Sequence, residues 1–240
     1  MWIVAEYEAT ALFSLKPATA TSSGGKTLLV PTPYAVKMAL LDAACRLDGQ
    51  RAAEIAWDGW LRGLTVAIRP AARIVVNNLF TKVLRQRRSP AEPGSRHAGF
   101  FQQTIAYREY AHLGGTFGLA LEPAAKADVG KLKRWLLAIN YLGKRGSFIQ
   151  IVHPPREEAD LPQGFIRVDG VLPEQFAVAA VMTQLDDAGD RLTFSKASIY
   201  SGERITLGKE RVLRHVILPY KLVASSRGYS HYELSGEGEP

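Results

Sequence analysis

Basic side chains crowd one stretch of this 240-residue chain, between residues 69 and 108. The stretch holds eight lysines and arginines against a single acid, Glu92, so its net charge of +7 equals that of the whole chain. Cations concentrated in this way indicate a polyanionic partner, with nucleic acid favoured. Two alternatives stay open: a solvated basic hairpin that aids solubility, and an acidic protein partner. The eight cations are Arg69, Arg73, Lys82, Arg85, Arg87, Arg88, Arg96 and Arg108.

Four of these arginines lie beside aromatic residues. Guanidinium groups can neutralise successive phosphates along one strand, and aromatic faces stack on unpaired bases for about 1–3 kcal/mol each. The combination predicts binding of single-stranded nucleic acid, although any one of the aromatics is more typical of ordinary hairpin packing. The arginines are Arg85, Arg87, Arg88 and Arg96, and the aromatics are Phe100, Phe101, Tyr107 and Tyr110.

Motifs for a bound nucleotide or metal are weak. Residues 24–27 (Gly-Gly-Lys-Thr) resemble the end of a phosphate-binding loop, but Ala20 stands where the upstream glycine is required. The segment fits better as a flexible loop whose backbone N–H groups and Lys26 can contact a phosphate. The five histidines include no pair at helical spacing, and the lone Cys45 excludes an internal disulfide and a cysteine-based zinc site. We therefore expect no metal and no cofactor.

Other titratable groups are weaker candidates for a catalytic role. His97 lies in the basic loop, where an imidazole can act as general acid or base in RNA cleavage, although a lone loop histidine is more often a solvated donor. The adjacent acids at 157–158 and 186–187 point to different sides of any regular element, so we expect surface acids there.

Length and composition suit one large domain or two small ones. A hydrophobic fraction of 47% can fill a core, which excludes general disorder. The longest apolar run, residues 176–182, is far shorter than the ~20 residues of a membrane-spanning helix. Residues 1–6 lack the basic and apolar regions of a signal peptide, so we expect a soluble cytoplasmic protein with no membrane contact.

The N-terminal part begins with a strand and then a helix. Polar and apolar residues alternate, which predicts a strand over 1–15, and a polar, glycine-bearing loop follows at 16–28. Thr32 can cap a helix over 33–47, with Pro33 at its first position, where a missing N–H costs nothing.

Two further helices are predicted. One spans 51–61, with Ile55, Trp57 and Trp60 on its buried side. The other begins at Pro123 and ends at Gly143. Its buried face is expected to consist of Val129, Leu132, Leu136 and Ile139.

The remaining segments are mostly strand. Residues 73–87 and 100–121 predict a long hairpin with its tip at 85–97, and a short strand is expected over 147–152. Residues 153–172 read as loop. Later strands are predicted over 176–182, 192–200 and 211–218, before a frayed tail at 235–240.

The order strand, helix, strand, strand, helix, strand is that of a ferredoxin-like (RRM-like) α+β fold. Residues 1–152 are expected to form this core, with a protruding basic β-hairpin thumb at 73–121. Residues 153–240 are expected to be a β-rich extension packed on the same domain. Such a sheet carries both helices on one face and leaves the other free, a surface that RNA-recognition domains use for binding.

Four segments follow an arrangement known from one protein family. They are an N-terminal strand leading to 29–44 (LVPTPYAVKMALLDAA), the basic tip 85–101, Tyr-Arg-Glu-Tyr at 107–110, and 141–148 (YLGKRGSF). In these segments the chain resembles the Cas-five family of CRISPR-associated RAMP proteins. The resemblance covers about residues 1–152, and the C-terminal third offers no matching motif.

The resemblance implies a non-catalytic subunit of a type I-like Cascade surveillance complex. Such a subunit binds the 5′ handle of the CRISPR RNA (crRNA) and caps the effector backbone in antiviral defence. A Cas-seven-type backbone subunit and a Cas-eight-type large subunit are the implied partners, with target DNA reached only through the complex. One branch of the family cleaves precursor RNA with a Tyr, Lys, His set in which Lys and His are adjacent, and no Lys-His pair occurs here.

Handle RNA is single-stranded, so a basic arm, a polar loop and a charged turn can grip its phosphates. The main alternative is a metal-independent endoribonuclease for CRISPR repeat RNA, with His97 or His112 as acid or base and Tyr107 nearby. A protein–protein adaptor without an RNA role is a third possibility. The expected RNA contacts are Lys16, Ser22, Ser23, Lys26, Thr27, Arg85, Arg87, Arg88, Arg96, His97, Arg108, Lys144 and Arg145.

Overall fold

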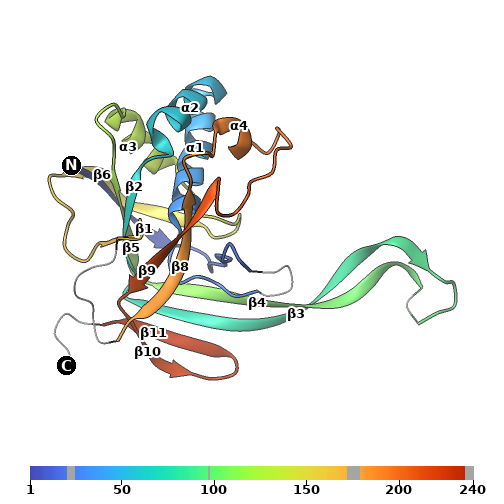
Figure 1. Cartoon of the computed structure of the whole chain (residues 1–240). Helices are drawn as coiled ribbons and strands as arrows, with labels where there is room; N and C mark the ends of the chain where they lie inside the picture. Colours follow the sequence, from blue (N-terminus) through green and yellow to red (C-terminus); the bar gives the residue numbers. More distant parts are fainter. Residues whose placement is uncertain (21–24, 97, 172–178, 236–240) are drawn as a thin grey trace.

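The protein is a mixed α/β structure built on antiparallel sheets, as the sequence predicted. The computed structural model describes residues 1–20, 25–96, 98–171 and 179–235. Figure 1 shows a body of sheet and helices from which one long hairpin projects. Among the residues described, no helix is long and apolar enough to cross a membrane.

The main sheet has the strand order β6-β1-β5-β2-β7, and each neighbouring pair is antiparallel. β5 is the central strand, and β1 lies between β5 and the edge strand β6. The side chains of β1 alternate between two apolar clusters, one on each face of the sheet. The strands are β1 (Trp2–Ala9), β2 (Thr65–Arg69), β5 (Thr116–Glu122), β6 (Ile149–Glu158) and β7 (Ile166–Arg167).

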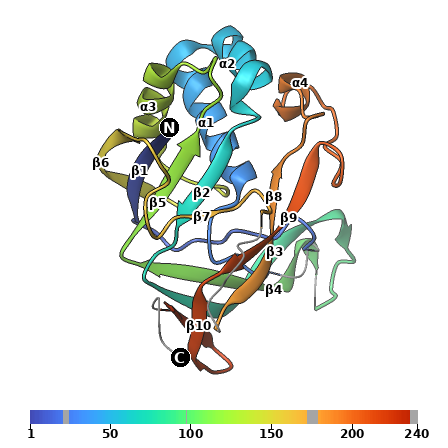
Figure 2. The same ribbon diagram turned by 60° about the vertical axis from the view of Figure 1, so that its left-hand side comes forward.

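Helices α1 (Pro33–Asp48) and α3 (Val129–Ala138) lie on the same side of this sheet (Figure 2). α1 begins where the sequence predicted, because the Thr32 hydroxyl oxygen accepts a 3.1 Å hydrogen bond from a backbone N–H of the first turn. α3 is shorter than the predicted helix over 123–143. Its true start is set by Asp128, whose carboxylate accepts from a backbone N–H of the first turn.

Helix α2 (Gln50–Ala56) continues into a π-helical turn, η1 (Trp57–Leu61). Trp57 is buried as predicted, and its indole N–H donates a 2.8 Å hydrogen bond to the carbonyl of Leu192. Ile55 is 60% exposed, so its predicted burial is wrong. Positions two apart on a helix lie about 200° apart, so Ile55 and Trp57 cannot share one face.

The projecting hairpin, called the thumb below, consists of β3 (Arg73–Ala91) and β4 (Gly99–Gly114). Its two strands pair without a register shift from their base as far as Gln86 and Phe101. The predicted hairpin is therefore confirmed, although its strands run further toward the tip than expected.

The predicted return strand over 100–121 is in fact two strands. Gly115 has φ +95, a conformation that favours glycine, and the chain turns there out of the thumb and into β5 of the main sheet. β2 was not predicted at all, because five residues give too short an alternation to be recognised. The thumb is therefore an insertion between β2 and β5, with its own sheet, instead of a pair of core strands.

β6 also differs from the prediction, since it continues beyond 152 through Pro154 and Pro155. Two adjacent prolines favour a loop when the sequence is considered alone. β6 is an edge strand of the main sheet, and an edge tolerates residues that lack a backbone N–H.

The C-terminal third adds two hairpins, β8 with β9 and β10 with β11. β11 also pairs with β3, so the thumb shares a four-stranded sheet with the C-terminal hairpin. Neither β10 nor β11 was predicted, whereas β9 matches its prediction. These strands are β8 (Val181–Ala188), β9 (Arg211–Leu218), β10 (Tyr220–Ser225) and β11 (Tyr229–Leu234).

The strand predicted over 192–200 is wrong. The segment contains a single helical turn, α4 (Phe194–Ala197), because Thr193 caps it with its hydroxyl oxygen. Of the strand predicted over 176–182, only the last residues belong to β8, and residues 172–178 and 236–240 lie outside the described part of the chain.

The sheet face opposite the helices is closed, which corrects the expectation of a free RNA-binding surface. Phe165 packs over it so closely that a Cβ on Gly118 would lie 2.5 Å from the Phe165 ring. Glu6 on the same face pairs with Arg69 at 3.1 Å and with Arg156 at 2.9 Å. The apolar centre of this face and the Glu6 carboxylate are therefore engaged within the protein.

A buried ion pair attaches β8 to α1. The Lys37 ammonium lies 2.6 Å from a carboxylate oxygen of Asp187, and the two side chains are only 2% and 9% exposed. Burial lowers the pKa of Lys37, and Asp187 opposes that shift. Asp186 and Asp187 are both buried, so the prediction that this pair is a surface feature is wrong.

Replacing Lys37 with Met should lower the free energy of unfolding by about 3 kcal/mol, because Asp187 then stays buried without its cation. The double variant Lys37→Met/Asp187→Leu removes both members of the pair and should recover part of that loss, because Arg214, 4.0 Å from Asp187, then also lacks its carboxylate. Urea denaturation followed by circular dichroism measures both. A single variant as stable as the parent would show that the pair does not stabilise the fold.

Candidate nucleic-acid interface

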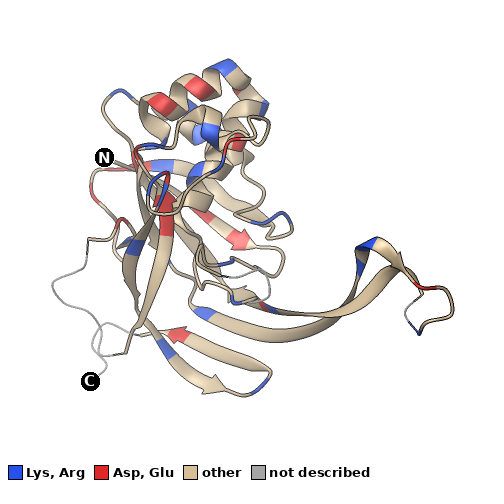
Figure 3. Cartoon of the chain, turned by 45° about the vertical axis from the view of Figure 1, so that its right-hand side comes forward, with Lys and Arg blue, Asp and Glu red and all other residues tan. Residues whose placement is uncertain are grey.

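The thumb arginines carry charges that no carboxylate neutralises within the described residues. Arg85, Arg88 and Arg96 are exposed. Arg87 is half-buried, and its Nε has no hydrogen-bond partner. Figure 3 shows these cations along the projecting hairpin, away from the acids of the body. The thumb is thus a positively charged arm open to solvent.

The two faces of the thumb differ in chemistry. Directly paired residues share a face, so the register places four apolar side chains on one side. They are 59–71% exposed, an unusual degree for large apolar groups. Lys82 lies on this side as well, whereas Arg85 and Arg108 lie on the opposite side. The four apolar residues are Phe80, Leu84, Phe101 and Ile105.

The proposed nuclease residues are not brought together. Tyr107 pairs with Phe80 and His112 with Val75, so they lie on opposite faces of β4. Five residues of strand separate them by roughly 17 Å along the chain. Burial and the neighbouring Glu109 carboxylate raise the pKa of Tyr107, so its hydroxyl is a poorer acid and gives up its proton less readily. His97 lies outside the described residues.

The polar loop at 16–27 returns to the base of the thumb. The backbone N–H of Glu109 donates a 2.6 Å hydrogen bond to the carbonyl of Gly25, and the N–H of Thr27 donates to the Glu109 carboxylate at 2.9 Å. A Cβ at Gly25 would lie 2.0 Å from the carbonyl oxygen of Tyr107, so only glycine fits there. Lys26 is exposed beside this contact.

Four other predicted contacts of this loop have different outcomes. Thr27 has a structural role, because its hydroxyl oxygen accepts from the N–H of Leu15 at 2.9 Å. Lys16 is exposed. Ser22 and Ser23 lie outside the described residues.

The turn after α3 presents two free cations. The N–H of Ser147 donates to the carbonyl of Lys144 at 3.0 Å, and Gly143 and Gly146 have φ of +71 and +108. These positive φ values make the turn tight. Lys144 and Arg145 project from it into solvent, without a carboxylate partner in the part of the chain described.

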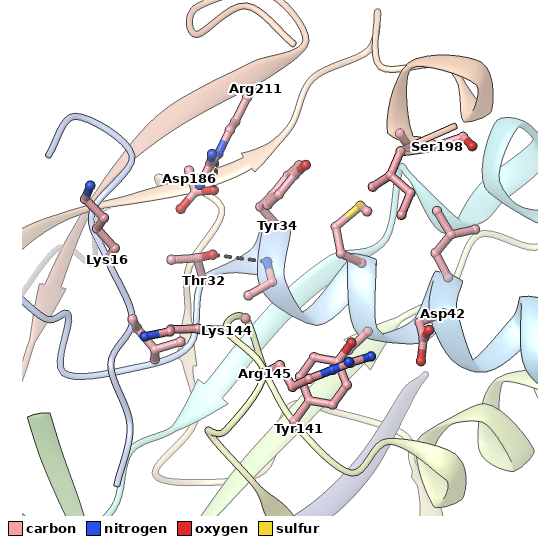
Figure 4. Close-up of a pocket in the computed structure, with 18 of the residues that line it drawn as sticks. Lys16, Thr32, Tyr34, Asp42, Tyr141, Lys144, Arg145, Asp186, Ser198 and Arg211 are labelled. Carbon is pink, nitrogen blue, oxygen red and sulfur yellow. Dashed lines mark hydrogen bonds and ion pairs between the residues drawn. The ribbon is translucent and has the colours of Figure 1, made fainter. Parts of the chain in front are cut away.

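A cavity of about 940 Å³ connects these parts. One side of it carries Lys16, Arg108, Lys144 and Arg145, so the structure brings together residues that are far apart in sequence. Its floor is α1, and its other wall is the segment 194–211 (Figure 4). Sequence reasoning did not select the floor and wall residues, since nothing local indicates that they meet: Tyr34, Met38, Tyr141, Ser198, Tyr200 and Arg211.

The wall of the cavity is held by ionic contacts. Arg211 donates a 2.6 Å hydrogen bond to buried Asp186, and its guanidinium lies 4.5 Å from the centre of the Tyr34 ring. Lys196 pairs with Glu210 at 2.6 Å, and a second Glu210 oxygen accepts from the N–H of Thr206 at 2.9 Å. These contacts fix the segment 194–211 opposite α1.

The chain is thus a mixed α/β protein with a cationic arm beside a large cavity. Comparison with known proteins finds CRISPR-associated protein Cas5 of Archaeoglobus fulgidus, which is 20% identical over 212 residues, or 84% of this chain and 86% of that protein. This match confirms the resemblance to the Cas-five family that the sequence motifs indicated. No family model matches the chain.

Two solved structures are also similar. A CRISPR protein from Archaeoglobus fulgidus is 14% identical, with a TM-score of 0.38 over 98% of this chain and 92% of that one. A chain of a CRISPR RNA-guided surveillance complex is 15% identical, with a TM-score of 0.40 over 90% of each chain.

The described residues offer no metal-binding cluster. Within the described residues, no three or more His, Cys, Asp or Glu side chains lie close enough together to hold a metal ion. Cys45 is a free, half-buried thiol.

The wall should respond to acid through Glu210. Hydrogen bonds from Lys196 and Thr206 lower the pKa of this carboxyl from 4.5 to about 2. Its contribution to stability is therefore complete above pH 4.5 and is lost as the pH falls toward 2. Glu210→Gln should reduce stability at pH 7 and flatten its decline between pH 4.5 and 2, as measured by urea denaturation across that range.

The matched control is Glu8→Gln, which changes an exposed carboxylate on β1. It should leave the acid-induced decline as in the parent. An unchanged decline in Glu210→Gln as well would rule out the carboxylate as the holding group.

Proposed function

We propose that this protein is a non-catalytic, cytoplasmic subunit of a type I-like Cascade surveillance complex and binds the 5′ handle of the crRNA. The relative named CRISPR-associated protein Cas5 supports a CRISPR role. The observation that carries the RNA-binding proposal is the projecting thumb, whose arginines have no carboxylate partner among the described residues. Unneutralised cations on a protruding arm suit a flexible polyanion.

The path of the RNA follows the free cations. From the thumb arginines it passes Arg108 at the thumb base, then Lys16 and Lys26 of the polar loop, and reaches the turn with Lys144 and Arg145. The closed, internally paired opposite face of the main sheet supports this route over the sheet surface used by RNA-recognition domains.

The core of residues 1–152 is proposed to be ferredoxin-like. The order β6-β1-β5-β2, with the thumb inserted between β2 and β5, agrees with a βαββαβ path through an antiparallel sheet. We propose residues 153–240 as an extension of the same domain, because Leu185, Val216 and Leu218 contribute to the same hydrophobic core as β1 and α1.

Within the complex, the partners proposed are a Cas-seven-type backbone subunit and a Cas-eight-type large subunit, with target DNA contacted only through the assembly. A subunit that binds the RNA end would cap the backbone in antiviral defence. The exposed apolar face of the thumb (Phe80, Leu84, Phe101 and Ile105) supports a protein neighbour.

Replacing Arg87 and Arg88 with Ala should weaken binding of single-stranded handle RNA. It should also lower the slope of log K against log salt by about 1.4, because each lost phosphate contact removes about 0.7. Fluorescence anisotropy at 50–300 mM KCl measures the slope.

The control variant is Arg51→Ala/Lys126→Ala, which removes two exposed cations far from the thumb. It should bind with the parent's slope. If the thumb variant also keeps the parent's slope, the thumb does not contact the RNA.

Purified protein incubated with CRISPR repeat RNA in EDTA should leave the RNA intact, because Tyr107 and His112 lie on opposite faces of β4 and cannot act on one phosphate. Denaturing gel electrophoresis measures cleavage. Specific cutting that His112→Ala abolishes would establish the endoribonuclease alternative instead.

A further inference from the structure

We infer that the cavity between α1 and the segment 194–211 holds unpaired bases of the bound RNA, with Tyr200 stacking on a base at its mouth. The inference rests on the proposed function and adds a base-binding site that includes the C-terminal third. It assigns a binding role to Tyr34 and Tyr200, which no sequence motif indicated.

The cavity has a cationic side that suits a phosphate and an apolar side that suits a base. Its cationic side is made by Lys16, Arg108, Lys144 and Arg145, and none of these pairs with a carboxylate within the described residues. Its floor and far wall are largely apolar or aromatic. Phosphates bind to cationic side chains, and bases stack on apolar or aromatic ones. The apolar and aromatic groups are Tyr34, Met38, Ala39, Tyr141, Phe194, Ile199 and Tyr200.

Tyr200 and Ile199 are placed for contact with a ligand. They are 92% and 87% exposed although both line the cavity, so neither contributes to the core. The segment that carries them is nevertheless fixed at both ends, by the Thr193 cap of α4 and by the Lys196–Glu210 pair. An exposed aromatic on a positioned segment loses little side-chain freedom on binding.

Polar groups in the cavity suit the edges of bases. Gln50, Ser198 and the Asp42 carboxylate oxygen that does not accept from Arg46 line the same space, and they offer donors and acceptors to a Watson–Crick edge. Figure 4 shows Asp42 and Ser198 at the opposite end from Lys16. A base can therefore enter between Tyr34 and Tyr200 while its phosphate stays on the cationic side.

The position of the cavity favours RNA over a protein segment or a free nucleotide. Arg108 lines the cavity and also belongs to β4, so the cationic surface of the thumb continues into it. A volume of about 940 Å³ lies at the upper end for small-molecule sites, which leaves room for more than one base. An apolar protein segment would leave four cations without partners.

The test uses the full chain and two fluorescein-labelled probes, oligo-U and oligo-A ribonucleotides of eight residues. Tyr200→Ala should weaken binding of at least one probe about tenfold without changing the salt slope, because it removes stacking and no charge. Ala39→Phe, which fills the cavity floor, should weaken binding to a similar extent. The control Ile55→Ala removes another exposed apolar group, on α2 outside the cavity, and should bind as the parent does.

The outcomes separate the two proposals. If Tyr200→Ala and Ala39→Phe bind as the parent does while Arg87→Ala/Arg88→Ala binds more weakly, the cavity is not a base site and the proposed function stands. If the parent binds neither probe, both proposals fail. Because Tyr200 is almost fully exposed, its variant stays informative even if Ala39→Phe does not fold.

Discussion

The ion pair between Lys37 and Asp187 fixes how the C-terminal third lies on the rest of the molecule. Lys37 belongs to α1 and is almost fully buried, where a lone ammonium would cost on the order of several kcal/mol, and the carboxylate that offsets this cost lies on β8. β8 and β9 pair along their length, so the same contact determines where Arg211 meets Tyr34. The cavity follows from this geometry, because α1 is its floor and the β8–β9 unit carries its wall.

The presence or absence of ion-pair partners also determines where the molecule keeps a net charge. In the body, acids such as Glu6 and Asp48 are paired with arginines, so they present little net charge to a ligand. The thumb has almost no acids and therefore keeps its positive charge. The strand register then divides its side chains, with four exposed apolar groups on one face and Arg85 and Arg108 on the other. Under the proposed function, this narrow two-stranded ribbon would contact the RNA and a protein neighbour at once.

Local signals in the sequence predicted local structure well. Thr32 with Pro33 fixed the start of α1, and the basic hairpin and the Gly143–Gly146 turn were recognisable from their residues. Long-range pairing was not predictable in this way. The five residues of β2 can be recognised as a strand only from their pairing with β5. The face of the sheet opposite the helices is covered by Phe165, which lies 47 positions beyond Gly118 in the sequence.

Because long-range contacts are not predictable from local signals, the cationic residues of the candidate site were predictable and its aromatic residues were not. A lysine or arginine is charged wherever the chain places it, so a cluster of these residues can be recognised from the sequence alone. Tyr34, Tyr141 and Tyr200 look like any other aromatics until α1, the turn and the 194–211 segment surround one cavity. Cations on the thumb attract every single strand alike, because phosphates are the same at each nucleotide. Discrimination between sequences therefore has to come from a place where bases are contacted, and in the inference above that place is the cavity between α1 and the segment 194–211.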